Sequence, residues 1–274
     1  MLDAHLHVVD AATSGPDRTG HPDGAWWESI DASPTAVAAR LAEAGVDGGV
    51  LVQAVGAHGD DNSFALEAAT VLGRGWRAVA AVGADADDPV TTIERAAATG
   101  AAGVRLFSIP RPQIGWLDGE LGRRLVARCA DLALTPTICC TAPELAAAAA
   151  LVASFPDLEF AVDHAGFVAI GGDEGELGSL IRHPNAVLKL STGVFDHSAL
   201  DPAKTVARLL DLVGTERLAW GSDHPQVRDR TYGELAALGR RAVEGLPDAT
   251  RAAVLEGTTA RLWFSSPFSP FSDA

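Results

Sequence analysis

The first residues that could do chemistry lie at the amino terminus, in the segment Leu2-Asp3-Ala4-His5-Leu6-His7-Val8-Val9-Asp10. The segment reads as a β-strand, whose successive side chains point to opposite faces. We therefore expect Asp3, His5 and His7 to share one face. Two imidazoles one strand step apart can converge on one metal ion or one substrate oxygen. The same pattern is also typical of paired structural histidines, so it needs support from elsewhere in the chain.

That support comes from polar residues at or near the ends of later apolar segments. They are Gln53, Arg105, Asp163, His164, Lys189 and Asp223. Polar side chains inside apolar strands are costly unless they are paired, so their accumulation predicts a shared site. His164 and Asp223 are the strongest functional candidates, because both close strands that are otherwise apolar.

The remaining candidates have two interpretations each. Arg105 is either an ion-pair partner inside the sheet or a fork that binds a substrate carboxylate. Lys189 is either a salt-bridge partner or a substrate ligand, and Gln53 is expected to bind substrate. Trp26 and Trp27 form either the wall of a substrate pocket or a hydrophobic plug.

Other histidines and the cysteines carry weaker signals. His58 and His197 follow strand-like segments and could reach the rim of a pocket, whereas the side chain of His224 should leave Asp223 in another direction. Surface positions are expected for the last two histidines, His21 and His183. The thiols are expected to be reduced and packed rather than nucleophilic, as in a cytoplasmic protein; they are Cys129, Cys139 and Cys140.

Eight apolar segments of strand length alternate with helical segments. The strands are expected near residues 2–10, 49–53, 78–83, 103–107, 135–140, 158–163, 186–191 and 218–221. Helix starts are marked by Ser33-Pro34, Asp88-Pro89 and Asp201-Pro202, and Thr141 with Glu144 reads as a capping box. This alternation predicts a single-domain (β/α)8 barrel over residues 1–264, followed by a tail at 265–274. A doubly wound open sheet is the second possible fold, and it ranks lower because no Gly-rich dinucleotide-binding turn follows the first strand.

Composition limits the partners. The chain has 274 residues, is 47% hydrophobic and carries a formal charge of −15, which argues against nucleic acid or an anionic membrane as partner. It contains no apolar run long enough to span a membrane. A small-molecule ligand and a cytoplasmic location are therefore expected, and a homo-oligomer is left open.

The motifs resemble the amidohydrolase superfamily, specifically the branch that includes 2-pyrone-4,6-dicarboxylate lactonases and sugar-lactone and muconolactone hydrolases. The matching motifs are Asp3-x-His5-x-His7, Leu51-Val52-Gln53 with Asp61-Asn62, Gly103-Val104-Arg105, Val162-Asp163-His164-Ala165-Gly166, Pro184-Asn185 with Leu188-Lys189-Leu190-Ser191, and Trp220-Gly221-Ser222-Asp223-x-Pro225.

The resemblance implies a reaction centre of His5, His7, His164 and Asp223, with Asp223 as the general base and Arg105 on a substrate carboxylate. These four would also be the ligands of one divalent metal ion, with zinc the first expectation; a metal-independent site stays open because the branch contains both kinds. Arg105 and the Cys139-Cys140 pair stand where binuclear members have their bridging and fifth-strand ligands, which argues against two metals.

The expected function is hydrolysis of a lactone that carries a carboxylate or several hydroxyls. A metal-dependent decarboxylase of an unsaturated carboxylic acid is the first alternative, and a non-catalytic sensor of small carboxylates is the second. Substrate choice is expected to lie in the loops at residues 11–28 and 107–118.

Overall fold

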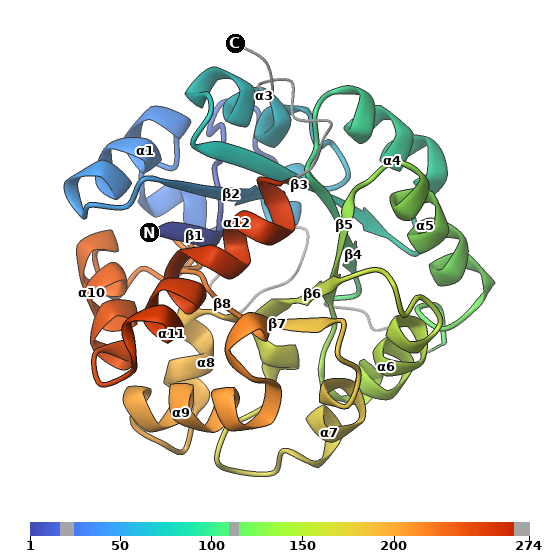
Figure 1. Ribbon diagram of the computed structural model, residues 1–274. Coiled ribbons are helices and arrows are strands. Elements are labelled where there is room, and N and C mark those ends of the chain that lie inside the picture. Colours follow the sequence, from blue (N-terminus) through green and yellow to red (C-terminus); the bar gives the residue numbers. More distant parts are fainter. Residues whose placement is uncertain (17–24, 110–114, 266–274) are drawn as a thin grey trace.

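The computed structural model describes residues 1–16, 25–109 and 115–265. Eight parallel strands pair in sequence order to form one sheet, and this sheet curls into a nearly closed barrel (Figure 1). The strands are β1 (Leu2–Leu6), β2 (Gly48–Val52), β3 (Trp76–Gly83), β4 (Gly103–Phe107), β5 (Thr135–Cys139), β6 (Phe160–Val162), β7 (Ala186–Leu190) and β8 (Leu218–Trp220).

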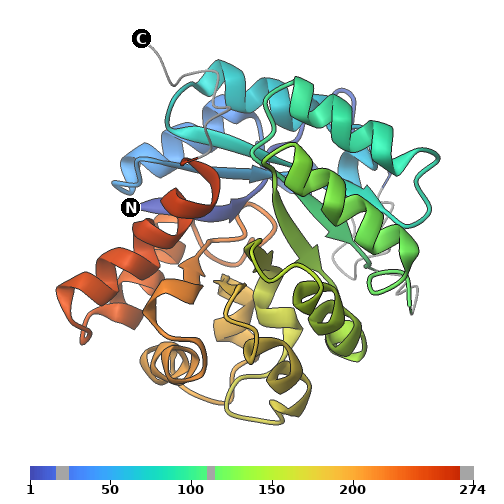
Figure 2. The same cartoon turned by 45° about the vertical axis from the view of Figure 1, so that its right-hand side comes forward.

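Helices surround the strands as an outer ring (Figures 1 and 2). The α-helices are α1 (Pro34–Glu43), α2 (Val55–His58), α3 (Ser63–Leu72), α4 (Pro89–Ala98), α5 (Glu120–Asp131), α6 (Leu145–Ala153), α7 (Gly175–Ile181), α8 (Thr192–His197), α9 (Pro202–Val213), α10 (Tyr232–Val243), α11 (Asp248–Ala252) and α12 (Thr258–Trp263). The single-domain (β/α)8 barrel predicted from the alternation is confirmed.

Three predicted helix starts follow from side-chain caps. The oxygens of Ser33, Asp88 and Asp201 accept hydrogen bonds from backbone N–H groups in the first turns of α1, α4 and α9, at 3.4, 3.1 and 3.0 Å. A proline follows each cap at a position where its missing N–H is not needed. The predicted strand–helix punctuation is therefore confirmed at these sites.

The capping box predicted at Thr141 is wrong. Thr141 makes no capping bond, because the carboxylate of Glu144 turns away and accepts a hydrogen bond from Ser108 Oγ at 2.6 Å. The structure instead has a capping box at Thr231 and Glu234, at the start of α10.

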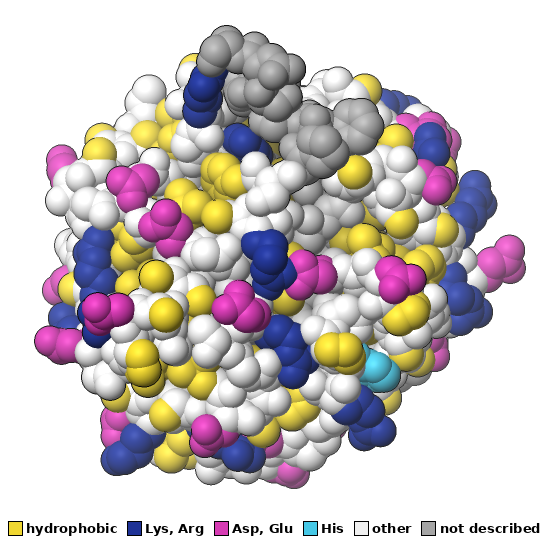
Figure 3. Space-filling model, viewed as in Figure 1, with side chains coloured by type: hydrophobic (Ala, Val, Ile, Leu, Met, Phe, Trp, Pro, Cys, Tyr) yellow, Lys and Arg dark blue, Asp and Glu magenta, His cyan; other side chains and the backbone are white. Residues whose placement is uncertain are grey.

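The amino end of the barrel is closed by the carboxyl-terminal helices. Helix α12 lies across this end (Figure 1), and Trp263 packs with the inward-facing residues Ala4, Val50 and Ala219. Acidic and basic side chains of the described residues alternate over the same face (Figure 3). Because barrels of this kind carry their active sites at the carboxyl ends of the strands, the candidate active site is expected at the opposite end of this barrel.

In the described part of the chain, no helix is both long enough and apolar enough to cross a membrane. Residues 266–274, which include nearly all of the predicted tail, lie outside the described ranges, as does His21.

Strand β1 differs from the simple alternation that the sequence predicted. Asp3 is paired with Gly49 and Leu6 with Leu51, so one extra residue of β1 bulges between these pairs. The bulge turns Asp3 to the outer face with Leu6, while His5 stays inside. Asp3 therefore does not share a face with His5; its carboxylate accepts hydrogen bonds from Ser222 N at 2.9 Å and from Tyr232 Oη at 3.1 Å.

The barrel closes through the ends of its first and last strands. Asp223 N donates to the carbonyl of His5 at 2.8 Å, and His7 N donates to the carbonyl of His224 at 2.8 Å. Leu6 and His224 form the only β-bridge outside the named strands in the described ranges. The backbone that joins the barrel edges therefore carries two of the histidines and the carboxylate predicted for the site.

The bulged region of β1 predicts a steric test at Gly49. A Cβ at Gly49 would lie 2.7 Å from the carbonyl oxygen of Asp3 and 2.7 Å from Leu6 Cδ2. We expect Gly49→Ala to lower the free energy of unfolding in urea by about 1–3 kcal/mol, as for other overpacked positions. Gly233→Ala, at a helical position with no atom within 4 Å, is the control and should be neutral or stabilising by up to about 1 kcal/mol. Equal midpoints for Gly49→Ala and the wild type would contradict this packing.

Candidate active site

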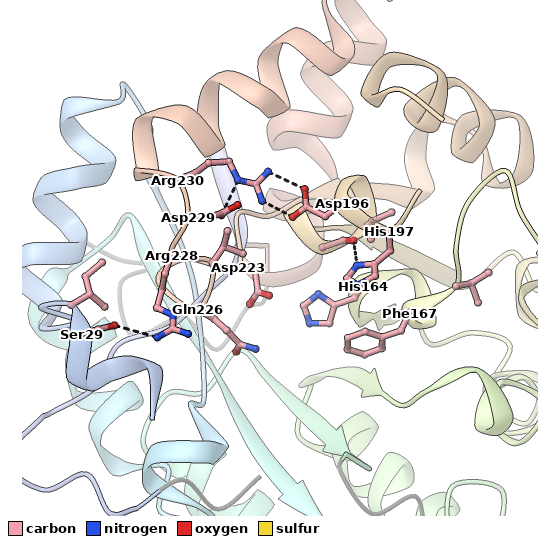
Figure 4. A pocket seen from close by; sticks show the side chains of 15 residues that line it. Ser29, His164, Phe167, Asp196, His197, Asp223, Gln226, Arg228, Asp229 and Arg230 are labelled. Carbon is pink, nitrogen blue, oxygen red and sulfur yellow. Dashed lines mark hydrogen bonds and ion pairs between the residues drawn. The ribbon is translucent and has the colours of Figure 1, made fainter. Parts of the chain in front are cut away.

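The structure brings together four residues predicted from separate parts of the sequence. His5 lies in β1, His7 follows that strand, His164 follows β6, and Asp223 follows β8. All four side chains are buried, and Figure 4 shows His164 and Asp223 facing each other across a cavity. The carboxyl ends of the strands thus converge on one histidine–carboxylate cluster.

A second carboxylate, Asp163, lies beneath this cluster as the centre of a buried ion network. Its Oδ2 accepts a hydrogen bond from Arg105 Nε at 2.6 Å, and its Oδ1 lies 3.0 Å from Lys189 Nζ. The same Oδ1 is 3.3 Å from His5 Nδ1. Burial would raise the pKa of Asp163, but Lys189 and Arg105 outweigh it and hold that pKa well below its usual range. Asp163 is therefore an anion that orients three of the predicted residues.

Asp223 faces two imidazoles. Its Oδ1 lies 3.3 Å from His7 Nε2 and 3.6 Å from His5 Nε2. Burial by itself would raise the pKa of Asp223, but His164, His7 and His5 together lower it below its usual range. Burial likewise lowers the pKa values of His5 and His164, only partly opposed by the nearby carboxylates. The arrangement is an ionised carboxylate beside His5 and His164, both of which favour the neutral form.

The donor atoms of this cluster fit a divalent cation. His7 Nδ1 lies 2.8 Å from the carbonyl of Val52, so a neutral His7 donates there and turns the lone pair of Nε2 towards Asp223. His5 Nε2 and Asp223 Oδ1 are buried without a hydrogen-bond partner. The ligand atoms of His5, His7 and Asp223 lie within 4.8 Å of one another. Imidazole nitrogens with a carboxylate oxygen are suitable ligands for zinc and similar ions.

The backbone at the site is strained. Five non-glycine residues in the described ranges have positive φ angles, and four of them are His164, Ala165, Phe167 and Asp223. Together with Gly166, the first three of these four make the segment Asp163–Phe167 a left-handed turn, a conformation that costs L-residues about 1–2 kcal/mol each. Ser191 Oγ, 2.7 Å from His164 Nδ1, helps to hold the turn. Such strain persists where surrounding contacts fix a functional geometry.

Two cavities meet at the cluster. The outer one has a volume of about 900 Å³, and the inner one, about 130 Å³, reaches towards the barrel interior. Both are lined by His164, Phe167, Asp223 and Gln226. A small molecule that enters the outer cavity can therefore reach the histidine–carboxylate cluster.

The predicted substrate-binding residues take different positions. Arg105 and Gln53 line the inner cavity, and Lys189 lines neither cavity because it is fully buried against Asp163. Lys189 Nζ also lies 4.8 Å from the ring centroid of Trp263. Lys189 therefore supports the site from below instead of facing a substrate.

The side-chain amide of Gln53 is hydrogen-bonded through its nitrogen but not through its oxygen. Its Nε2 donates to the carbonyls of Gly59 and Asp61, at 3.0 and 2.7 Å, whereas its Oε1 is buried without a partner. The two donated bonds fix the amide orientation. Gln53 thus presents an acceptor to the inner cavity.

Trp26 and Trp27 each match one of the two interpretations given from the sequence, pocket wall and hydrophobic plug. Trp26 lines the inner cavity, with its ring centroid 6.0 Å from that of His7. Trp27 packs against Trp26 in a small hydrophobic cluster with Val9 and Ala57. One tryptophan is therefore cavity wall and the other is the plug behind it.

The other histidines lie farther out. His197 lines the outer cavity, while His58 is buried against Phe64. His224 points away from Asp223, as predicted, and lies between Tyr232 and Arg40. The three thiols are buried, and burial raises the pKa of Cys139 to about 12, so its thiolate is scarce at neutral pH.

Sequence reasoning missed the roles of Asp163 and Phe167. The sequence places Asp163 among the polar residues of the predicted site without a role of its own, although two cations in apolar strands with no assigned anion, Arg105 and Lys189, are a signal for that role. Phe167 gave no signal, because its placement depends on the left-handed turn.

The ion network predicts the effect of neutralising Asp163. Asp163→Asn would leave Arg105 and Lys189 buried with no anion between them, so we expect the free energy of unfolding to fall by about 3–5 kcal/mol. Asp131→Asn is the control, because its carboxylate is 68% exposed and 3.5 Å from Arg128, and it should change stability by about 0.5 kcal/mol or less. Urea titrations compare the free energies of unfolding of the two variants. Similar small losses in both would show that Asp163 does not stabilise the buried charges of Arg105 and Lys189.

Comparisons with known proteins place the chain among relatives. The model of the amidohydrolase family matches residues 2–264. A search of curated proteins found no match. A solved amidohydrolase from Burkholderia multivorans, with bound zinc, is 25% identical over 96% of this chain and 98% of that chain, with a TM-score of 0.76.

Two further structures share the fold at lower identity. A candidate 2-pyrone-4,6-dicarboxylic acid hydrolase from Pseudomonas putida is 22% identical, with a TM-score of 0.77 over 96% of this chain and 97% of that chain. A 5-carboxyvanillate decarboxylase from Sphingomonas paucimobilis is 13% identical, with a TM-score of 0.66 over 96% of this chain and 98% of that chain. The match over nearly the whole length, together with the histidine–carboxylate cluster at the barrel mouth, shows that this chain belongs to the amidohydrolase family.

Proposed function

We propose that the protein is a hydrolase that opens the ring of a lactone bearing a carboxylate or several hydroxyl groups. The observation that carries the proposal is Asp223, an ionised carboxylate with an unpartnered oxygen that faces His5 and His7 and lines both cavities. A base of this kind, beside imidazoles that can polarise a carbonyl, suits attack of water on an ester.

Asp223 would act on the water. As the water oxygen attacks the ester carbonyl carbon, Asp223 takes its proton; as the ring C–O bond breaks, Asp223 returns a proton to the leaving oxygen. The low pKa of Asp223 keeps it ionised at neutral pH, ready for the first step. The product is the open-chain hydroxy acid.

The surrounding residues would bind and polarise the lactone. His164, neutral and held by Ser191, is placed at the cavity to stabilise negative charge that develops on the carbonyl oxygen. Arg105 lines the inner cavity and gives only its Nε–H to Asp163, so its terminal N–H groups suit a substrate carboxylate.

The cluster also suits a metal, because the ligand atoms of His5, His7 and Asp223 lie within 4.8 Å of one another and His164 faces Asp223 across the cavity. A divalent ion held by His5, His7, His164 and Asp223 would act as a Lewis acid and lower the pKa of bound water. Zinc in the related amidohydrolase from Burkholderia multivorans makes it the first ion to test.

A panel assay tests the proposal. Purified protein is mixed with sugar lactones, muconolactones and pyrone dicarboxylates, with added zinc or with chelator, and proton release is followed with a pH indicator. We expect fast release with one class of lactone, and loss of activity in chelator if a metal is required. Release of carbon dioxide from an unsaturated carboxylic acid, with no lactone opened, would replace the proposal with the decarboxylase alternative.

Replacement of the proposed base gives a sharper test. Asp223→Asn keeps the side-chain size but removes the proton acceptor, so we expect kcat for the best lactone to fall by about two to four powers of ten. Asp211→Asn, on the exposed side of α9, is the matched control and should keep the wild-type rate. A wild-type kcat in Asp223→Asn would remove Asp223 from the role of base. Metal content is measured in parallel to separate loss of the base from loss of a bound ion.

A further inference from the structure

Phe167 is exposed in a way that the rest of the fold does not explain. Its side chain is 47% exposed, and the only other exposed large hydrophobic residue in the described ranges is Val71, on the outer helix α3. Phe167 is not on the outer surface of the barrel ring; it lines both the outer and the inner cavity. Apolar surface left uncovered in a cavity is surface that a ligand can bury.

The backbone fixes Phe167 in this position. The residue has a φ angle of +58° and ends the left-handed turn that also carries His164. Gly166 lies so close to Leu145 that an added Cβ would be 2.6 Å from Leu145 Cδ2, and Ala165 is fully buried. The ring therefore cannot withdraw into the core without breaking the packing of the two preceding residues.

The ring lies beside the reaction centre. The centroids of Phe167 and His164 are 4.7 Å apart, with the ring planes tilted by 46°. Figure 4 shows these two side chains on one side of the cavity, with Asp223 and Gln226 across from them. A substrate whose carbonyl is next to His164 would have its ring within reach of the face or edge of Phe167.

Two other aromatic residues line the same inner cavity. They are Trp26 and Phe107, and the guanidinium carbon of Arg105 lies 4.8 Å from the ring centroid of Phe107. Aromatic rings pack best against flat rings in offset-stacked or edge-to-face arrangements. Beyond the histidine–carboxylate cluster, the polar side chains that line the inner cavity are those of Gln53, Arg105 and Gln226, whereas charged side chains gather in the outer cavity. The inner cavity therefore offers few partners for the hydroxyls of a polyhydroxylated ring.

We propose that Phe167 is a specificity-determining residue that selects a substrate with a flat, conjugated ring and a carboxylate over one with a puckered or polyhydroxylated ring. The inference rests on the proposed function, because it narrows the class of lactone that the same site opens. The left-handed turn couples the two tasks, since it presents the recognition ring of Phe167 and the imidazole of His164 from one rigid segment.

Binding of two matched carboxylates tests this without turnover. Benzoate and cyclohexanecarboxylate carry the same charged group on a flat and on a puckered ring. Their dissociation constants are measured by calorimetry or ligand-observed NMR with the zinc-supplied protein. We expect the wild type to prefer benzoate by about tenfold, the scale of one good aromatic contact.

Three variants assign the preference to the ring. Phe167→Ala removes it, and Phe167→Leu keeps apolar size without a flat face; both should bring the ratio of dissociation constants close to one. Val71→Ala, the other exposed hydrophobic residue, should leave the ratio unchanged. Thermal melting checks that each variant is folded, and Phe167→Leu decides the matter if Phe167→Ala does not fold.

The outcomes separate this inference from the proposed function. A preference for benzoate that both Phe167 variants lose supports the inference even if no lactone is hydrolysed. If lactones are hydrolysed, Phe167→Ala should raise KM for conjugated rings about tenfold with little change in kcat, whereas a merely structural role would lower kcat and the melting temperature together. Equal binding of the two acids by the wild type, absence of binding, or a ratio unchanged in Phe167→Leu would overturn the inference.

Discussion

The structure depends on one buried carboxylate. Asp163 is the anion that lets Arg105 and Lys189 exist inside the barrel, and it touches His5 as well. Each cation alone would be costly in that interior, and the carboxylate alone would lose its charge. Together they form a rigid platform beneath the histidine–carboxylate cluster, which helps to fix the orientation of His5. Asp163 and Lys189 line neither cavity, whereas Arg105 reaches the inner cavity from this platform and Asp223 lines both cavities.

A second constraint is stored in the backbone. His164, Phe167 and Asp223 all have positive φ angles, and contacts on every side keep them there: Ser191 on the imidazole, Leu145 against Gly166, and the β1 backbone on Asp223 N. The strain is tolerated because these neighbours belong to packed strands and helices. The consequence is pre-organisation, since a side chain pinned by an unusual backbone loses little freedom when a ligand binds.

Much of this could be predicted from the sequence, and the failures have physical causes. Apolar segments and cap residues located the strands and helices, because buried parallel strands are apolar on both faces and caps satisfy free N–H groups. The grouping of His5, His7, His164 and Asp223 followed from strand ends. The side of Asp3 could not be predicted, because a bulge breaks the two-residue period, and the cap at Thr141 failed because Glu144 found a tertiary partner. Likewise, the left-handed turn at Phe167 depends on packing that no local pattern encodes.

The joining of β1 to β8 has a consequence for how the protein is made. The segment with His5 and His7 is synthesised before the other seven strands of the barrel, yet the strand that leads to Asp223 is the last of the eight. Until β8 emerges from the ribosome, the open edge of β1 has no partner and Asp223 is not yet opposite His5 and His7. Such long-range pairing is formed late and slowly. A nascent or truncated chain that ends before β8 therefore carries most of the barrel but an incomplete histidine–carboxylate cluster, so assembly of the cluster waits for the last strand.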